Sequence, residues 1–182
     1  MRRRKLPIAL LGVVLAVALV SGCERRAEQA ARRSPNEVLA EATGYYCGMR
    51  LVDHDGPKGQ VQLASGGAPI WFSSVRDTLV FLRLPEEPRD IAAAYVNDMG
   101  RSKDWKQPDA GAWVDPRDAW FVIDSRARSG MGTPEAVPFS DQAAAEAFRV
   151  VQGGRVVRLD GIPDVYLFDS AREPAKPPAA TP

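Results

Sequence analysis

Residues 70–84 read IWFSSVRDTLVFLRL, a short apolar piece typical of a strand that ends in Phe-Ser and leads into a helical pattern. Residues 137–151, VPFSDQAAAEAFRVV, follow the same order. In each stretch an N-cap residue stands at the start of the expected helix, Ser74 in the first and Asp141 in the second. Two copies of one strand-to-helix junction predict an internal repeat.

The segments around both junctions extend this repeat. Strand patterns precede the two helices at residues 59–64 and 119–125 and follow them at residues 91–96 and 155–159. Each half therefore predicts the order strand, strand, helix, strand. The expected fold is α+β, with two similar small ββαβ-type units at residues 45–100 and 117–170 and a connecting loop between them.

Composition narrows the class of protein. The chain has 182 residues, 45% hydrophobic and 26% charged, which is ordinary for a soluble globular domain and excludes a chain disordered throughout. The formal net charge of +1 gives no indication of nucleic-acid binding. With 2 Cys and 1 His, the chain has too few ligands for a disulfide scaffold or for a zinc site made of Cys and His.

The N-terminus has the layout of a secretory signal peptide. Residues 1–23 read MRRRKLPIALLGVVLAVALVSGC, in which the apolar run from Ile8 to Val20 is short for a permanent membrane span. Val20-Ser21-Gly22-Cys23 resembles the lipobox of bacterial lipoproteins, which implies cleavage after residue 22 and lipid on Cys23. The alternative is a short transmembrane anchor with an incidental Cys. Glu24, in place of Asp, weakly favours the outer membrane.

Composition also predicts where the folded region begins and ends. Residues 23–44 are charged and Ala-rich, typical of a tether between the membrane and the folded region. Residues 171–182, AREPAKPPAATP, predict a Pro-rich disordered tail. The folded region is then expected at residues 45–170.

The densest set of reactive side chains is Cys47-Gly48-Met49 followed by His54. Met131 lies between two Gly residues in a turn-like segment, an unusual place for a methionine that only fills a core. Thiolate, thioether and imidazole together select soft metals, and Cu(I) is the ion expected outside the cytoplasm. Zinc fits less well, since thioether is a poor zinc ligand.

Other interpretations of these residues stay open. Cys47 fits a buried inert thiol, His54 a turn residue between two Asp, and Met99 a core residue at the end of a strand. Cys47 and His54 would also suit a nucleophile and base of a hydrolase or transpeptidase, although no third group is evident. A metal-free lipoprotein that recruits partners is a further alternative.

Five motifs carry a resemblance to a known family. They are YYCGMRLVDHDGPKGQV (45–61), AYVNDMG (94–100), WVDPRDAWFVIDS (113–125), SGMGTPEAVPFSD (129–141) and AAAEAF-VVQGG-V (143–156). In this order they resemble the nitrous-oxide-reductase accessory lipoproteins, the NosL family. The resemblance implies a non-enzymatic, periplasm-facing lipoprotein that binds one Cu(I) and acts as a copper chaperone.

The same resemblance implies partners, fold and ligands. The expected partners are nitrous oxide reductase and its ABC-type maturation complex with a periplasmic component, besides the membrane reached through the lipid. The implied fold is the pair of ββαβ-type units, related to the organomercurial lyases. Cys47 and Met131 become the strongest metal-ligand candidates, with Met49 and His54 next.

Overall fold

The computed structural model describes residues 33–169. The chain divides into two units, residues 1–34 and 35–182, and every described helix and strand lies in the second unit. The predicted signal peptide, Cys23 and the predicted tail lie outside the described residues. Within the described part, no helix combines the length and the apolar character needed to cross a membrane.

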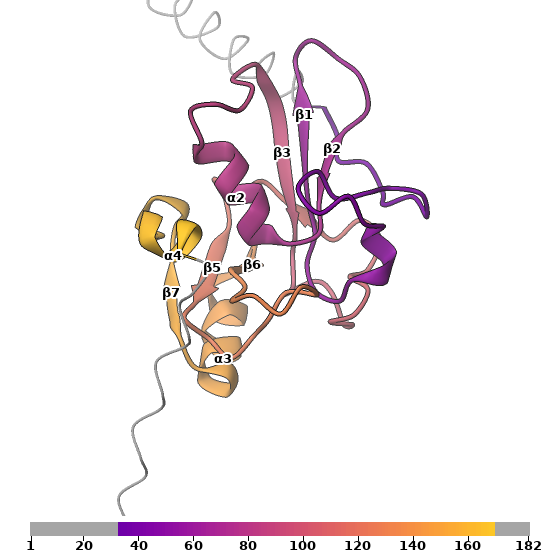
Figure 1. The fold of residues 1–182 in the computed structure, drawn as a ribbon. Helices are drawn as coiled ribbons and strands as arrows, with labels where there is room; N and C mark the ends of the chain where they lie inside the picture. Colours follow the sequence, from indigo (N-terminus) through magenta and orange to yellow (C-terminus); the bar gives the residue numbers. More distant parts are fainter. Residues whose placement is uncertain (1–32, 170–182) are drawn as a thin grey trace, which may run out of the picture. The chain divides into compact units, whose positions relative to one another are not determined.

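The first sheet has the strand order β2-β1-β3-β4, and all neighbouring strands are antiparallel. The helix α2 connects β2 to β3 and packs against this sheet (Figure 1). These elements are β1 (Gly59–Leu63), β2 (Ile70–Phe72), α2 (Val75–Arg83), β3 (Ile91–Asn97) and β4 (Trp113–Val114).

The second sheet has the strand order β6-β5-β7, again antiparallel throughout, and α3 packs against it. Its elements are β5 (Trp120–Ile123), β6 (Val137–Phe139), α3 (Gln142–Gln152) and β7 (Arg155–Val157). Shorter helical pieces are η1 (Leu51–Asp53), η2 (Leu159–Gly161) and α4 (Asp164–Phe168), and α4 contacts α2. The fold is thus a small mixed α/β domain with two sheets and few helices.

Both predicted helix starts are confirmed. The Ser74 side chain accepts a hydrogen bond from Asp77 N at 3.0 Å, and the Asp141 side chain accepts one from Ala144 N at 2.8 Å. Each bond satisfies a backbone donor that has no partner within its helix. At the other end of α3, Gly153 has a φ of 75°, a backbone conformation that residues with a side chain rarely adopt, and the helix ends there.

The largest hydrophobic cluster joins the two sheets. From the first sheet and α2 it contains Val75, Leu79, Val96 and Val114, and from the second sheet and the C-terminal elements it contains Phe121, Ile123, Ile162, Tyr166 and Leu167. Two smaller clusters lie within the separate sheets, one around Phe72 and Phe81 and one around Val137 and Phe139. Each sheet therefore depends on the other for part of its buried surface.

The packed region begins before residue 45, the boundary expected from composition. Asn36 N donates to Gln60 Oε1 of β1 at 2.9 Å, and Glu37 accepts from Gly111 N at 3.0 Å. Ala42 is buried. Hydrogen bonds attach this segment to the rest of the fold. Its packing therefore could not be predicted from its content of large apolar side chains.

Candidate metal site

Cys47 lies at the tip of a tight turn. Thr43 and Arg50 form an antiparallel bridge, and Gly44 N donates to Met49 O at 2.9 Å. Inside this ladder Gly48 N donates to Gly44 O, and Gly48 has a φ of 65° that residues with a side chain rarely adopt. The turn is attached to the first sheet, because Tyr45 N donates to Trp71 O of β2 at 2.7 Å.

The two preceding aromatic residues give the turn a second attachment. The hydroxyl groups of Tyr45 and Tyr46 both donate to the carboxylate of Glu87, at 3.3 and 2.8 Å. Burial, followed by the bond to Glu87, raises the pKa of Tyr46 above its ordinary value, so this hydroxyl stays protonated and keeps donating. The rings pack edge-on against each other and against Phe72.

The Cys47 thiol is half-buried and free. Its sulfur lies 3.6 Å from Ser73 Oγ, 3.9 Å from Gly44 O and 4.0 Å from Met49 O. A Cβ atom on Gly44 would lie 2.6 Å from Cys47 Sγ, so the glycine leaves the room that the sulfur occupies. Cys47 is absent from all three hydrophobic clusters of the described residues, which argues against an inert core thiol.

The methionines divide into exposed and packed. Met49 is 40% exposed and Met131 is 45% exposed, so neither residue is placed where it could serve chiefly as packing. Met99 differs, because it packs against the cluster around Val137 and Phe139, and its backbone N donates to Pro138 O. The core interpretation is thereby confirmed for Met99 alone among the three.

His54 has a ring nitrogen without a partner. The residue is only 9% exposed, and Nε2 is one of three buried side-chain nitrogen or oxygen atoms in residues 33–169 that lack a hydrogen bond. An unbonded buried polar atom is costly unless something else binds it. A metal ion would satisfy this nitrogen.

The loop that carries Met131 rests on the His54 segment. A Cβ atom on Gly130 would lie 2.6 Å from His54 Cβ and 2.7 Å from Asp55 N, so only a glycine permits this approach. The loop itself is closed by Ser129 N donating to Thr133 O and by Gly132 N donating to Ser129 O. The structure thus places Cys47 and Met49 in one turn, and it brings Gly130, the neighbour of Met131 in the chain, against His54.

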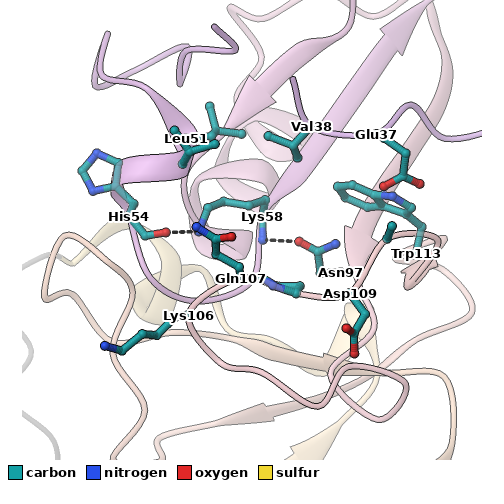
Figure 2. A pocket seen from close by; sticks show the side chains of 13 residues that line it. Glu37, Val38, Leu51, His54, Lys58, Asn97, Lys106, Gln107, Asp109 and Trp113 are labelled. Carbon is teal, nitrogen blue, oxygen red and sulfur yellow. Dashed lines mark hydrogen bonds between the residues drawn. The ribbon is translucent and has the colours of Figure 1, made fainter. Parts of the chain in front are cut away.

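A cavity of about 240 Å³ lies beside the His54 backbone (Figure 2). Lys58 and Asn97 line it, and the buried Lys58 ammonium donates to the carbonyl oxygens of His54 and Gly56. In Figure 2 the His54 ring points away from Lys58 and Asn97, while its backbone carbonyl accepts the hydrogen bond from Lys58. Burial lowers the pKa of Lys58 to about 8, against the opposing attraction of Glu135.

Glu135 is a buried ionisable residue that lies close enough to Lys58 to affect its pKa. Its Oε1 accepts from the backbone N–H groups of Arg76 and Ala136, while Oε2 has no partner. Burial raises the pKa of Glu135 to about 8, although these hydrogen bonds and Lys58 favour the charged form. A Glu directly before the apolar run of β6 was a signal for a buried carboxyl, and it was overlooked.

Within residues 33–169, no three His, Cys, Asp or Glu side chains come together as a metal-binding cluster. The predicted residues also include the thioether sulfurs of Met49 and Met131 beside the thiol of Cys47. Such a donor set suits a soft ion.

Comparison with known proteins agrees with the resemblance found in the sequence. The NosL family model matches residues 35–167. The chain is 40% identical over 168 residues to the "Copper-binding lipoprotein NosL" of Achromobacter cycloclastes, covering 92% of this chain and 86% of the relative. It is 33% identical over 162 residues to the protein of the same name from Stutzerimonas stutzeri, covering 89% and 83%.

A solved structure extends the likeness to the fold. The crystal structure of the copper chaperone NosL from Shewanella denitrificans is 31% identical with a TM-score of 0.67, and the match covers 72% of this chain and 97% of that one. Family model, relatives and fold agree over the region that contains Cys47, His54 and Met131. The chain belongs to the NosL family.

Proposed function

We propose that this protein is a lipid-anchored, non-enzymatic Cu(I) chaperone that delivers copper for assembly of the copper centres of nitrous oxide reductase. One observation carries the proposal. In this member of the NosL family, the half-buried free thiol of Cys47 lies in the same turn as the exposed thioether of Met49. His54, whose buried Nε2 has no hydrogen bond, lies against the loop that carries the exposed Met131. Relatives named as copper-binding lipoproteins support the choice of metal.

The proposed ligands are Cys47 and Met131 first, with Met49 and His54 next. Thiolate and thioether favour the reduced ion, because Cu(I) is softer than Cu(II). Cu(I) would displace the thiol proton of Cys47 to solvent, and the ion would keep its oxidation state throughout. The exposure of Met49 and Met131 supports transfer, since ligands at the surface can be replaced one at a time by those of a partner.

Anchoring and partners follow from the sequence. Cys23 is proposed to carry the lipid, and two or more acyl chains would hold the mature protein firmly to a membrane. The folded region would face the periplasm, with the outer membrane weakly favoured, and would meet nitrous oxide reductase and the ABC-type maturation complex there. The signal peptide at residues 1–22 and the Pro-rich tail at residues 171–182 are proposals on the same basis, whereas the packed region extends N-terminally of residue 45.

The finer description of the fold is also a proposal. Two ββαβ-type units would correspond to β1-β2-α2-β3 and β5-β6-α3-β7. The two sheets support it, since β1 is flanked by β2 and β3 in one and β5 by β6 and β7 in the other. A relation to the organomercurial lyases is proposed from the family resemblance alone.

The test is an anaerobic Cu(I) titration of the chain from Glu24 onward against a chromogenic chelator. We expect one tight equivalent in the wild type, an affinity lower by more than about 100-fold in Cys47→Ser, and one lower by roughly 10- to 100-fold in Met131→Leu. Met99→Leu is the matched control, because Met99 is packed and should leave the affinity unchanged.

Delivery needs its own measurement. Copper-loaded wild-type protein should restore the absorption bands of copper-depleted nitrous oxide reductase in the presence of the maturation complex, while Cys47→Ser should not. Failure of the wild type to compete with the chelator would reject the copper function. Cys47 would then be examined as a nucleophile by its reaction with electrophilic substrate analogues, and a protein that shows neither behaviour would be a metal-free scaffold.

A further inference from the structure

The hydroxyl of Ser73 contacts the Cys47 sulfur. It follows the last residue of β2 and precedes the N-cap of α2, and it is only 2% exposed. Its neighbour Ser74 performs the capping, so the Ser73 hydroxyl is not needed at the helix start. The Ser73 oxygen lies 3.6 Å from Cys47 Sγ, the shortest of the three contacts around the sulfur.

The other two polar neighbours of the sulfur cannot donate a hydrogen bond to a thiolate. Gly44 O and Met49 O, at 3.9 and 4.0 Å, are carbonyl oxygens and only accept hydrogen bonds. A protonated thiol can donate to any of these oxygens. Once a metal has replaced the thiol proton, the sulfur only accepts, and a hydroxyl is the one group of the three that can turn to donate.

At the corresponding position of the second sheet, the hydroxyl of a serine does donate a hydrogen bond. Ser140 follows β6 and precedes the N-cap Asp141, as Ser73 follows β2 and precedes Ser74. The Ser140 hydroxyl donates to Asp98 Oδ2, and the Ser140 backbone N donates to Oδ1 of the same carboxylate. The serine at this strand-to-helix junction of the second sheet thus donates to the side chain of Asp98.

We propose that Ser73 is a positioning residue, whose hydroxyl donates a hydrogen bond to the Cys47 thiolate when copper is bound. The inference rests on the proposed function and adds a determinant of affinity to the same site. As the copper–sulfur bond forms, the thiol proton passes to solvent and the Ser73 hydroxyl reverses from acceptor to donor. Hydrogen bonds to a charged acceptor are stronger than neutral ones, so the contact favours the copper-bound form.

Ser73→Ala tests the proposal, because it removes the hydroxyl from a buried position with little change of volume. The anaerobic titration should show one equivalent bound about tenfold more weakly, the lower end of the effect of outer-shell partners of a metal site. The ultraviolet thiolate-to-copper charge-transfer band should move to longer wavelength, because the sulfur lone pairs lose a donated hydrogen bond and rise in energy. A residue with only a structural role would not move this band.

Ser140→Ala is the matched control, since it deletes the hydroxyl at the same junction of the other sheet, where the acceptor is Asp98. It should lower the melting temperature while leaving the copper affinity and the band unchanged. Wild-type affinity and an unshifted band in Ser73→Ala would overturn the inference and leave the chaperone function intact. A wild type that binds no Cu(I) would overturn both.

Discussion

Glu135 stands out at the scale of single residues, because a fully buried carboxyl carries one oxygen without a partner. Its other oxygen accepts from Arg76 N at the first turn of α2, so the side chain connects the segment before β6 to a helix of the first sheet. Tyr166 adds to this connection by donating to the Glu135 carbonyl oxygen at 2.9 Å. A charge at this place acts on the contact between the two sheets.

The stability of the wild type should fall as the pH rises from 5 to 8. The pKa of Glu135 is about 8 in the folded chain against an ordinary value of 4.5, so in this range the folded chain holds a proton that the unfolded chain has lost. Stability decreases with pH wherever the folded state binds more protons. The expected loss is on the order of 3 kcal/mol, at about 1.4 kcal/mol for each tenfold change in proton affinity.

Glu135→Gln is the matched variant, because it keeps the shape and an acceptor oxygen but does not titrate. Urea unfolding at several pH values should give a flatter curve for this variant and higher stability than the wild type at pH 8. Asp77, whose pKa burial also raises, is present in both proteins, so the difference between the curves reports the part of the pH dependence that needs the Glu135 carboxyl. Two curves of equal slope would show that Glu135 does not hold this proton.

At the scale of elements, the loop 129–133 decides whether Met131 can reach the metal site. Gly130→Ala places a methyl group 2.6 Å from His54 Cβ and should force the loop away from the segment that contains His54 and Asp55. If Met131 is a ligand, the copper affinity should fall by about as much as in Met131→Leu, roughly 10- to 100-fold. The chelator titration measures this.

Gly132→Ala is the control within the same loop. Its added methyl group meets nothing within 4 Å, and it carries only the backbone strain of a φ of 78°. The control should therefore lose stability but much less affinity. Equal affinities for Gly130→Ala and the wild type would place Met131 outside the ligand set.

Local signals explain which elements could be predicted from the sequence. The strand-to-helix junctions carry their N-caps in the sequence, so α2 and α3 and the strands before them appear where they were expected. The two-residue strand β4 was missed, since it is too short to show a pattern and is formed by pairing with β3. The packing of residues 35–44 was missed for a similar reason, because it depends on distant acceptors such as Gln60.

In the candidate site, too, local arrangements could be predicted from the sequence and contacts between distant segments could not. The sequence alone brings Cys47, Met49 and His54 close together, because they are neighbours along the chain. The approach of Gly130 to His54 joins segments about 75 residues apart in the chain, and no local sequence pattern records such a contact. Ser73 was seen only as part of a helix start, and Lys58 gave no signal beyond its place after a Gly-Pro turn.

At the scale of the whole described region, the cluster around Phe121 makes the two sheets one cooperative unit. Residues from both sheets fill it, and α2 and α4 close it. Neither sheet alone would bury enough apolar surface to offset the entropy of folding.

Phe121→Ala should therefore destabilise both sheets equally, by about 3–5 kcal/mol as for other buried aromatic deletions. Amide hydrogen exchange followed by mass spectrometry checks this with peptides that contain β1 and β5. Val150→Ala, at an exposed position of α3, should leave both peptides unchanged. Protection lost in β5 but kept in β1 would mean that the sheets unfold independently.

The attachment of the Cys47 turn to β2 also affects how copies of the chain meet. A free sheet edge offers unpaired N–H and C=O groups to strands of other molecules, which is a route to aggregation. Here Gly44 pairs with Trp71 on the outer side of β2, and the opposite edge of the same sheet is the two-residue strand β4. Both edges of the first sheet are therefore poor templates for strand addition. If the proposed lipid on Cys23 gathers copies of the chain on a membrane surface, this arrangement would disfavour pairing between their sheets at the edge beside the Cys47 turn.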